Sequence, residues 1–136
     1  MSLTEKAQKV FAADRYATEL SGIEIASVGD HEACCTLTLA DKHCNARGVA
    51  MGGVLYTMAD FAAAIAANSD CLEEVLHWVS LDATAHYLTP APTGTSVKAV
   101  CRALKQGRTT ALYQTIIESP DNGKRVAIVE TTMIYV

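Results

Sequence analysis

The most continuous apolar stretch of the chain runs from Gly53 to Asn68 and predicts one long buried helix. Within it, Tyr56 and Asp60 are the only ionisable side chains, and Asp60 alone carries a charge at neutral pH. Apolar residues on nearly every side of a helix indicate that other elements wrap it. Because burying a carboxylate without a partner is costly, Asp60 is a candidate for a functional site, although structural ion pairs also bury acids.

Period-two alternation predicts the strands. Residues 31–39 alternate, with an apolar face of Ala33, Cys35, Leu37 and Leu39. Residues 76–88 alternate again, and their expected apolar face consists of Val79, Leu81, Ala83, Ala85 and Tyr87. The opposite, more polar face consists of Trp78, Ser80, Asp82, Thr84 and His86. Three more strands fit residues 95–105, 108–118 and 124–135, joined at Gln106-Gly107 and Asp121-Asn122-Gly123, which favour hairpin turns.

An amphipathic helix, or two, is predicted over residues 3–20, and Ile23 to Val28 indicate a short strand. The order is therefore one helical segment, two strands, the long helix and four strands, which is an α+β architecture. A helix hidden on every side requires a curved antiparallel sheet around it, with help from a second copy of the chain. We expect one domain, residues 1–136.

Composition narrows the possible partners and the cellular location. The net charge of −4 gives no reason to expect nucleic acid or an anionic membrane surface as a partner. No apolar run reaches membrane-spanning length, and the N-terminus lacks the pattern of a signal peptide. The five cysteines form no CxxC pair and have no metal-ligand spacing, which favours reduced thiols, a cytoplasmic location and no metal site.

Gly52 and Gly53 stand at the start of the long helix, where the first backbone amides lack internal acceptors and carry partial positive charge. Such amides suit an oxyanion or a polarised carbonyl, but the glycines could equally serve tight helix–sheet packing. Asp60 follows Gly52 by eight residues, roughly 12 Å along a helix. Two antiparallel copies of the helix could place Gly52 of one chain opposite Asp60 of the other, giving two equivalent sites in a two-fold dimer.

The central segment carries the spaced motif His43-x-Asn45-x-x-Gly48-x-x-Met51-Gly52-Gly53, followed by Ala59-Asp60. This motif resembles the HxNxxGxxHGG…(A/C)D pattern of hotdog-fold acyl-CoA thioesterases, and it is most similar to the PaaI-like branch, which includes phenylacetyl-CoA thioesterases. The likeness extends to Phe11-x-x-Asp14-Arg15-x-Ala17-x-x-x-Ser21-Gly22-Ile23, to Tyr87-Leu88-x-Pro90 and to the last three strands. The fold implied is a curved antiparallel sheet wrapped around a long central helix.

The resemblance implies catalytic roles for four residues. Asp60 occupies the position of the family's catalytic acid, which acts as general base on water or as nucleophile on the thioester carbonyl. The Gly52 N–H would polarise that carbonyl, and the Asn45 amide would bind the thioester or order the water. Ser80 matches a hydroxyl that orients the water in some members, although the alternation leaves open which strand face meets Asp60.

Implied substrate contacts include Gly53, Met51 and His43. Met51 stands where the family usually has His, so it either lines an apolar acyl pocket in an active enzyme or marks a slow or non-catalytic protein. His43 is expected to be a structural turn residue rather than a proton shuttle. Asp82 and His86 are roughly 13 Å apart on an extended strand, too far for a catalytic pair.

Basic residues gather in the last strands, at Lys98, Arg102, Lys105 and Arg108. They either form a solvated face or, with Arg102 and Arg108 as candidates, contact the phosphates of coenzyme A.

Together these features predict a thioesterase acting on a short-chain, medium-chain or aryl-acyl-CoA. Coenzyme A is then part of the substrate, and no metal or redox cofactor is implied. The expected assembly is a homodimer, extended to a dimer of dimers. The alternatives are a non-catalytic acyl-CoA-binding or regulatory domain and a hydratase or dehydratase, which would need a His paired with the acid.

Overall fold

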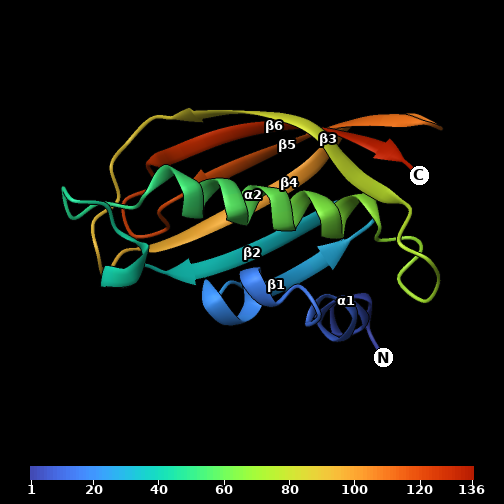
Figure 1. The fold of residues 1–136 in the computed structure, drawn as a ribbon, viewed down its shortest axis with the longest axis horizontal. Coiled ribbons are helices and arrows are strands. Elements are labelled where there is room, and N and C mark those ends of the chain that lie inside the picture. The colour runs from blue at the N-terminus through green and yellow to red at the C-terminus, as the bar shows by residue number, and fades with distance from the viewer.

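In the computed structural model, which describes residues 1–136, a curved antiparallel sheet of six strands holds one long helix on its concave side (Figure 1). The elements are α1 (Leu3–Phe11), a π-helical turn η1 (Tyr16–Leu20), β1 (Glu24–Gly29), β2 (Glu32–Thr38), a 3-10 turn η2 (Asp41–His43), α2 (Gly52–Ala67), β3 (Trp78–Tyr87), β4 (Ser96–Gln106), β5 (Thr110–Glu118) and β6 (Arg125–Tyr135). The predicted element order and α+β class are confirmed, with bounds that differ by one or two residues.

The strand order is β1-β2-β4-β5-β6-β3, and every neighbouring pair is antiparallel. β4, β5 and β6 form the predicted meander, joined at the two predicted hairpin turns. β1 and β3 are the edge strands. Since β3 pairs only with β6, its other edge leaves a row of backbone N–H and C=O groups without strand partners.

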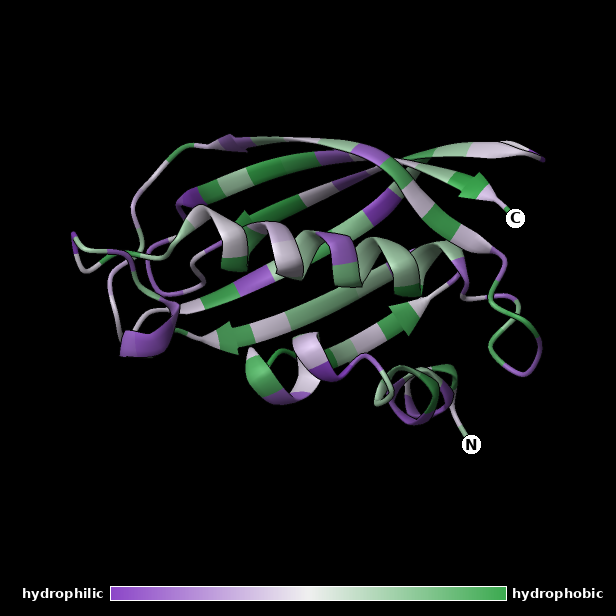
Figure 2. Ribbon diagram, viewed as in Figure 1, coloured by the Kyte–Doolittle hydropathy of each residue, from purple (hydrophilic) through white to green (hydrophobic).

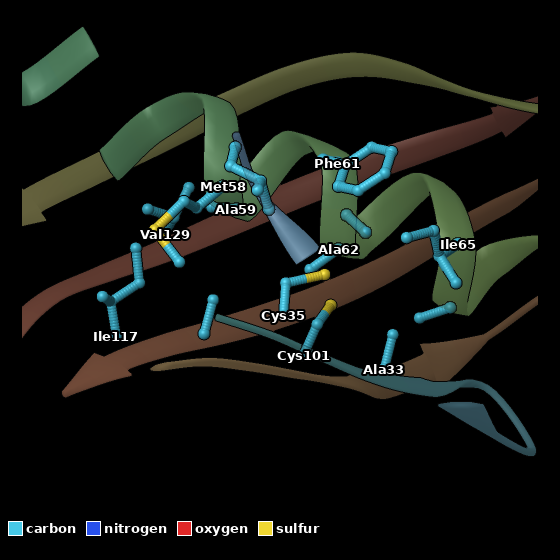
Figure 3. Packing of buried hydrophobic residues seen from close by; sticks show 14 of the residues in the cluster. Ala33, Cys35, Met58, Ala59, Phe61, Ala62, Ile65, Cys101, Ile117 and Val129 are labelled. Atoms are coloured by element: carbon cyan, nitrogen blue, oxygen red, sulfur yellow. The ribbon is translucent and has the colours of Figure 1, made fainter. Parts of the chain in front are cut away.

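The core lies between α2 and the sheet. Figure 3 shows Met58, Ala59, Ala62 and Ile65 of the helix over Cys35, Cys101 and Val129 of the strands. Small side chains on this side of α2 let the helix approach the sheet closely. Along the strands, hydrophobic and hydrophilic residues alternate, which leaves one sheet face for the core (Figure 2).

One strip of α2 is not covered in the single chain, so cover on every side would need the second copy of the chain that the prediction included. Gly53 and Tyr56 are exposed, and Asp60 and Ala64 on the same strip are half-buried. The physical reason is that the sheet covers one side of the helix and the N-terminal segment one flank. The remaining strip lies open between that segment and β3.

A bulge between Ser80 and Asp82 changes the prediction for β3. The extra residue, Leu81, reverses the alternation, because a one-residue insertion moves the following side chains to the other face. Trp78 and Ser80 therefore point toward α2, and beyond the bulge Ala83 and Ala85 take that side. The expected continuous apolar face from Val79 to Tyr87 is wrong, because Val79 and Leu81 are 44% and 57% exposed.

Cys35 and Cys101 are buried in the core, and all five cysteines are free thiols. Burial raises the pKa of the Cys101 thiol to about 12 and that of Cys35 further still. Cys34, next to Cys35, lies half-buried on the opposite sheet face, as the alternation predicts. No helix of the structure has the length and apolar character needed to cross a membrane.

Candidate active site

Asp60 lies midway along α2, on the uncovered strip, and is held from the side by β3. The Ser80 hydroxyl donates a 2.8 Å hydrogen bond to Asp60 Oδ1, while no protein group bonds Oδ2. Ser80 reaches the carboxylate because it precedes the β3 bulge. The structure thus settles which face of the strand meets Asp60, and it leaves one carboxylate oxygen free to take a proton from water.

A second group of site residues surrounds the start of α2. The Tyr87 hydroxyl donates to the Gly52 carbonyl at 3.0 Å, and the Tyr87 ring packs directly on Gly52. A Cβ added at Gly52 would lie 2.9 Å from Tyr87 Cζ, so any side chain at this position would have to displace the end of the Tyr87 ring. The Gly52 amide remains the first of the helix, without an intrahelical acceptor.

Gly53 has a different environment from Gly52. A Cβ added there would meet only the Met51 side chain, at 3.9 Å, so nothing within one chain demands glycine at this position. Met51 is 56% exposed and caps the helix without a side-chain hydrogen bond. The start of α2 thus presents bare backbone beside a flexible apolar side chain.

Asn45 belongs to the same group. Its Oδ1 accepts from the Arg47 and Val49 backbone amides at 2.9 and 3.4 Å, which fixes the loop, and its Nδ2 has no protein acceptor. An open groove of about 420 Å³ brings Asn45, Gly52 and Tyr87 together with apolar neighbours such as Leu55. A free amide donor, a free helix amide and an apolar wall in one groove suit a carbonyl group with an apolar substituent.

The His43 side chain holds the loop that carries Asn45. Its Nδ1 accepts from the Ala40 amide at 2.9 Å and its Nε2 lies 2.7 Å from the Ser21 carbonyl, so the proton belongs on Nε2. The ring is 7% exposed, and its backbone carbonyl accepts from the Met51 amide. This agrees with a structural role for His43, which ties the motif to the N-terminal segment.

The two groups are separate within one chain. Gly52 and Asp60 are eight helical residues apart, roughly 12 Å, which is too far for both to contact one small reacting group. The predicted partners Arg102 and Arg108 are not brought to either group. Arg102 lies on the sheet face away from α2, with its Nε 3.6 Å from Glu32 Oε2, and Arg108 lies in the β4–β5 hairpin.

Asp14 is a carboxylate near Asp60 to which the sequence reasoning gave no role of its own. Partial burial of its carboxyl and, next, the negative charge of Asp60 raise the pKa of Asp14 above its ordinary 3.8. The only sequence indication was its place in the N-terminal stretch that resembles the thioesterase pattern. Tyr87 was also missed as a polar contact, because the strand pattern placed it among apolar residues.

Comparison with known proteins shows which family this chain resembles. A model of the thioesterase superfamily matches residues 47–126. Human acyl-coenzyme A thioesterase 13 is 28% identical over 126 residues, which are 93% of this chain and 89% of the relative. Acyl-coenzyme A thioesterase PaaI of Escherichia coli K12 is 30% identical over 109 residues, 80% of this chain and 74% of the relative.

The solved structure of E. coli PaaI, a protein of the phenylacetic acid degradation operon, superposes with a TM-score of 0.84 at 26% identity. The match covers 99% of this chain and 96% of that one. The resemblance expected from the motif is thereby confirmed, together with the hotdog fold. The chain belongs to the thioesterase superfamily, as a PaaI-like hotdog-fold thioester hydrolase.

Proposed function

We propose that this chain hydrolyses the thioester of a short-chain, medium-chain or aryl-acyl-CoA to the free acid and coenzyme A. The observation that carries the proposal is the Asp60 carboxylate, held at one oxygen by Ser80 and open at the other, on the helix whose first amides stand free. Relatives named as acyl-coenzyme A thioesterases support the choice of acyl-CoA.

In this proposal the active enzyme is a homodimer, which forms by pairing of the edge strand β3 with β3 of a second copy. α2 runs antiparallel to β3: Gly52 contacts Tyr87, and Asp60 contacts Ser80. If two β3 edges pair about a two-fold axis at Thr84, the extra residue Leu81 brings Ser80 of one copy opposite Tyr87 of the other. Asp60 of each chain then lies opposite Gly52 of the second copy, and two equivalent sites form.

Exposed apolar side chains support pairing along this edge. Val79, Leu81, Tyr87 and Leu88 are 44–57% exposed in the single chain and lie on or just after β3. An unpaired edge strand with such side chains is a template for a second chain, because both its backbone groups and its apolar surface gain partners. A dimer of dimers remains part of the proposal, as an assembly of two such units.

In the proposed reaction, Asp60 takes a proton from water while the water oxygen adds to the thioester carbonyl carbon. The C=O electron pair moves to oxygen, and the Gly52 N–H of the second copy stabilises that oxyanion. When the oxyanion collapses, the C–S bond breaks and the thiolate takes the proton from Asp60. In the direct alternative, Asp60 attacks the carbonyl, the C–S bond breaks with loss of the thiolate, and a mixed anhydride forms. Water then cleaves the anhydride to the free acid and the Asp60 carboxylate, and the proton released protonates the thiolate.

Other residues fit supporting roles in this proposal. The Asn45 Nδ2 would donate a hydrogen bond to the carbonyl or to the water. Gly53, which has no side chain, would let the substrate come close to the backbone, and Met51 would contact the acyl group. Arg102 and Arg108 stay candidates for the coenzyme A phosphates, tested by the Michaelis constant after charge reversal. Water is the sole co-reactant of this reaction. The proposal also places the protein in the cytoplasm, where its cysteines would stay reduced.

Thiol release from a panel of acyl-CoAs, including phenylacetyl-CoA, tests this function. We expect turnover with the wild type and a fall in kcat of about 10³-fold or more in Asp60→Asn, which keeps the shape but removes the base. Asp121→Asn, at an exposed acid in the turn between β5 and β6 and outside the β3 edge, is the matched control and should leave kcat unchanged. Binding of an acyl-CoA without turnover would instead assign the non-catalytic alternative that Met51 raised.

A further inference from the structure

Asp14 lies in the turn between α1 and η1, which packing places beside α2. Phe11, the last residue of α1, meets Phe61 edge to face, with ring centroids 6.0 Å apart and planes at 84°. The Asp14 amide donates to the Phe11 carbonyl at 3.0 Å, so Asp14 follows that contact by one tight turn. Asp60 immediately precedes Phe61 on α2. One aromatic contact therefore brings both carboxylates to the same flank of the helix.

The N-terminal segment is fixed in this place by more than one contact. Ala17 in η1 is buried, and its carbonyl accepts from the Ile23 amide at 2.9 Å. The Asp14 carbonyl accepts from both the amide and the hydroxyl of Thr18, each at 3.0 Å. Figure 1 shows α1 and η1 on the β1 side of α2, whereas β3 lies at the opposite edge of the sheet. Asp60 is thus approached by Ser80 from one side and by Asp14 from the other.

No cation neutralises this pair of acids. Arg15, next to Asp14, instead bonds Glu19 at 2.9 Å, and the Lys42 ammonium donates to the Leu20 carbonyl at 3.1 Å. Lys9, in the last turn of α1, forms no ion pair.

The remaining titratable groups around the pair are few. Tyr56 lies one turn before Asp60 on α2 and is exposed, and Tyr16 of η1 is 67% exposed. From β3, the hydroxyl of Ser80 contacts Asp60, while Asp82 and His86 lie on the other strand face. The charge that Asp14 meets is therefore that of Asp60, and the raised pKa of Asp14 has this repulsion as its second cause, after burial.

We infer that Asp14 is the second carboxylate of the active site, a positioning residue that acts on the reaction through Asp60. The inference rests on the proposed function. When Asp60 takes the proton of water, negative charge leaves Asp60 and moves to the thioester oxygen, farther from Asp14. Repulsion from Asp14 therefore destabilises the ground state more than the transition state of the proton transfer.

A purely structural role for Asp14 makes a different prediction. An aspartate before a helical turn often serves as its cap, and asparagine caps a helix equally well. Asp14→Asn removes the charge and keeps a side chain that is able to cap, whereas Asp14→Glu keeps a charge. The pH dependence of catalysis distinguishes the electrostatic role from the structural role, because a loss of capping alone does not change it.

The test is the pH dependence of kcat/KM for the best acyl-CoA of the panel, in wild type, Asp14→Asn, Asp14→Glu and Asp60→Asn. We expect Asp14→Asn to lower the plateau about threefold to tenfold and to shift the acid limb to lower pH, since interacting carboxyls titrate as a pair. Asp14→Glu should restore most of the rate. Glu24→Gln, an exposed acid of β1 without an ion pair, is the control and should match wild type.

An Asp14→Asn profile that coincides with wild type, while Asp60→Asn is inactive, would overturn this inference and leave the proposed function standing. Full turnover in Asp60→Asn would instead remove the proposed function and this inference with it. Circular dichroism checks folding, and Asp14→Ser, another capping residue without charge, replaces Asp14→Asn should that variant not fold.

Discussion

Single residues decide how the Asp60 carboxylate is presented. The Ser80 hydroxyl has one proton, and it lies 2.8 Å from Asp60 Oδ1 but 3.5 Å from the Met133 sulfur, which is the weaker acceptor. The proton therefore points to the carboxylate. Asp60 is held at one oxygen by an uncharged group, which orients it without neutralising the charge that a base needs.

We predict that Ser80→Ala lowers kcat by about tenfold to a hundredfold with little change in KM, because the hydroxyl orients the base rather than the substrate. Steady-state kinetics on the best acyl-CoA measure both constants. Thr110→Ala removes an exposed hydroxyl from β5, outside the proposed interface, and serves as the control. A Ser80→Ala enzyme with wild-type kcat would show that the hydrogen bond has no catalytic role.

The second prediction concerns stability and pH at Asp14. Because the folded state raises its pKa, the folded protein holds this proton more tightly than the unfolded chain does. Stability therefore falls as pH rises from the unfolded pKa through the folded one, and above both the ionised carboxylate is a net cost. Asp14→Asn should raise Tm at pH 7 by about 1 °C, a small effect because the side chain is solvent-screened.

This gain in Tm should shrink toward zero as the pH is lowered through that window, where Asp14 becomes neutral in both states. Thermal melts at several pH values, with Glu24→Gln beside them, measure it. A lower Tm for Asp14→Asn at pH 7 would mean that the carboxylate stabilises the fold, contrary to the repulsion described above. The combination expected here, higher stability with slower turnover, is typical of strained catalytic groups.

The sequence predicted some site residues better than others for physical reasons. Asp60 and Gly52 could be singled out because their chemistry contrasts with an apolar neighbourhood, whereas Asn45 was indicated only by the resemblance to the thioesterase motif. The contact of Ser80 could not be predicted, since it depends on the bulge at Leu81, which leaves no mark in an alternating pattern. Asp14 could not be singled out either, because an aspartate near a helix end is common at protein surfaces and does not differ from its neighbours in the sequence.

At the scale of elements, Asn68 joins the end of α2 to the start of β3. Its Nδ2 donates to the Ala64 and Trp78 carbonyls at 2.9 and 3.0 Å, and its Oδ1 accepts from the Trp78 amide at 3.0 Å. The side chain is 1% exposed. Since β3 carries Ser80 and α2 carries Asp60, this amide also sets the register in which those two residues meet.

We therefore expect Asn68→Ala to lower the free energy of unfolding by about 2–4 kcal/mol, because it leaves buried backbone groups of Trp78 without partners. Urea denaturation measures the loss. Asn122→Ala in the exposed β5–β6 turn removes a comparable amide that bonds only the Lys124 N–H, and it should cost less than about 1 kcal/mol. Equal losses in the two variants would contradict a joining role for Asn68.

Elements were more predictable than their irregularities. Periods of 3.6 and 2 follow from side-chain burial, so helices and strands with one core face appear in the sequence. The π-helical turn at Tyr16–Leu20 and the β3 bulge insert residues out of period, and only the three-dimensional packing shows them. The apolar pattern of α2 indicates that the helix is removed from water, but it does not indicate which part of the cover the same chain provides and which part a second copy provides.

At the scale of the whole molecule, the proposed site depends on two chains. The helix rise of about 1.5 Å per residue separates Gly52 from Asp60, so no movement of side chains within one protomer joins them. The uncovered strip of α2 and the unpaired edge of β3 lie side by side, and one two-fold axis covers both. Asp60 and the amide that serves it would then always come from different copies.

Mixing two inactive variants tests this arrangement directly. Asp60→Asn lacks the base, and Gly52→Val blocks the approach to the helix amide, so each homodimer should be inactive. In a mixed dimer, Asp60 from the Gly52→Val chain meets Gly52 from the Asp60→Asn chain, and one of its two sites is intact. After the subunits exchange at equal amounts, half of the dimers are mixed, and activity should recover to about one quarter of wild type.

The control keeps both substitutions in one chain, because the double variant mixed with either single variant forms no intact site and should stay inactive. Gel filtration confirms that all mixtures remain dimeric. Gly52→Val displaces the end of the Tyr87 side chain, which is 53% exposed and free to move, so the variant is expected to fold. Absence of recovery in exchanged dimers would place Asp60 and its amide in the same chain, and the helix geometry above would then have to be wrong.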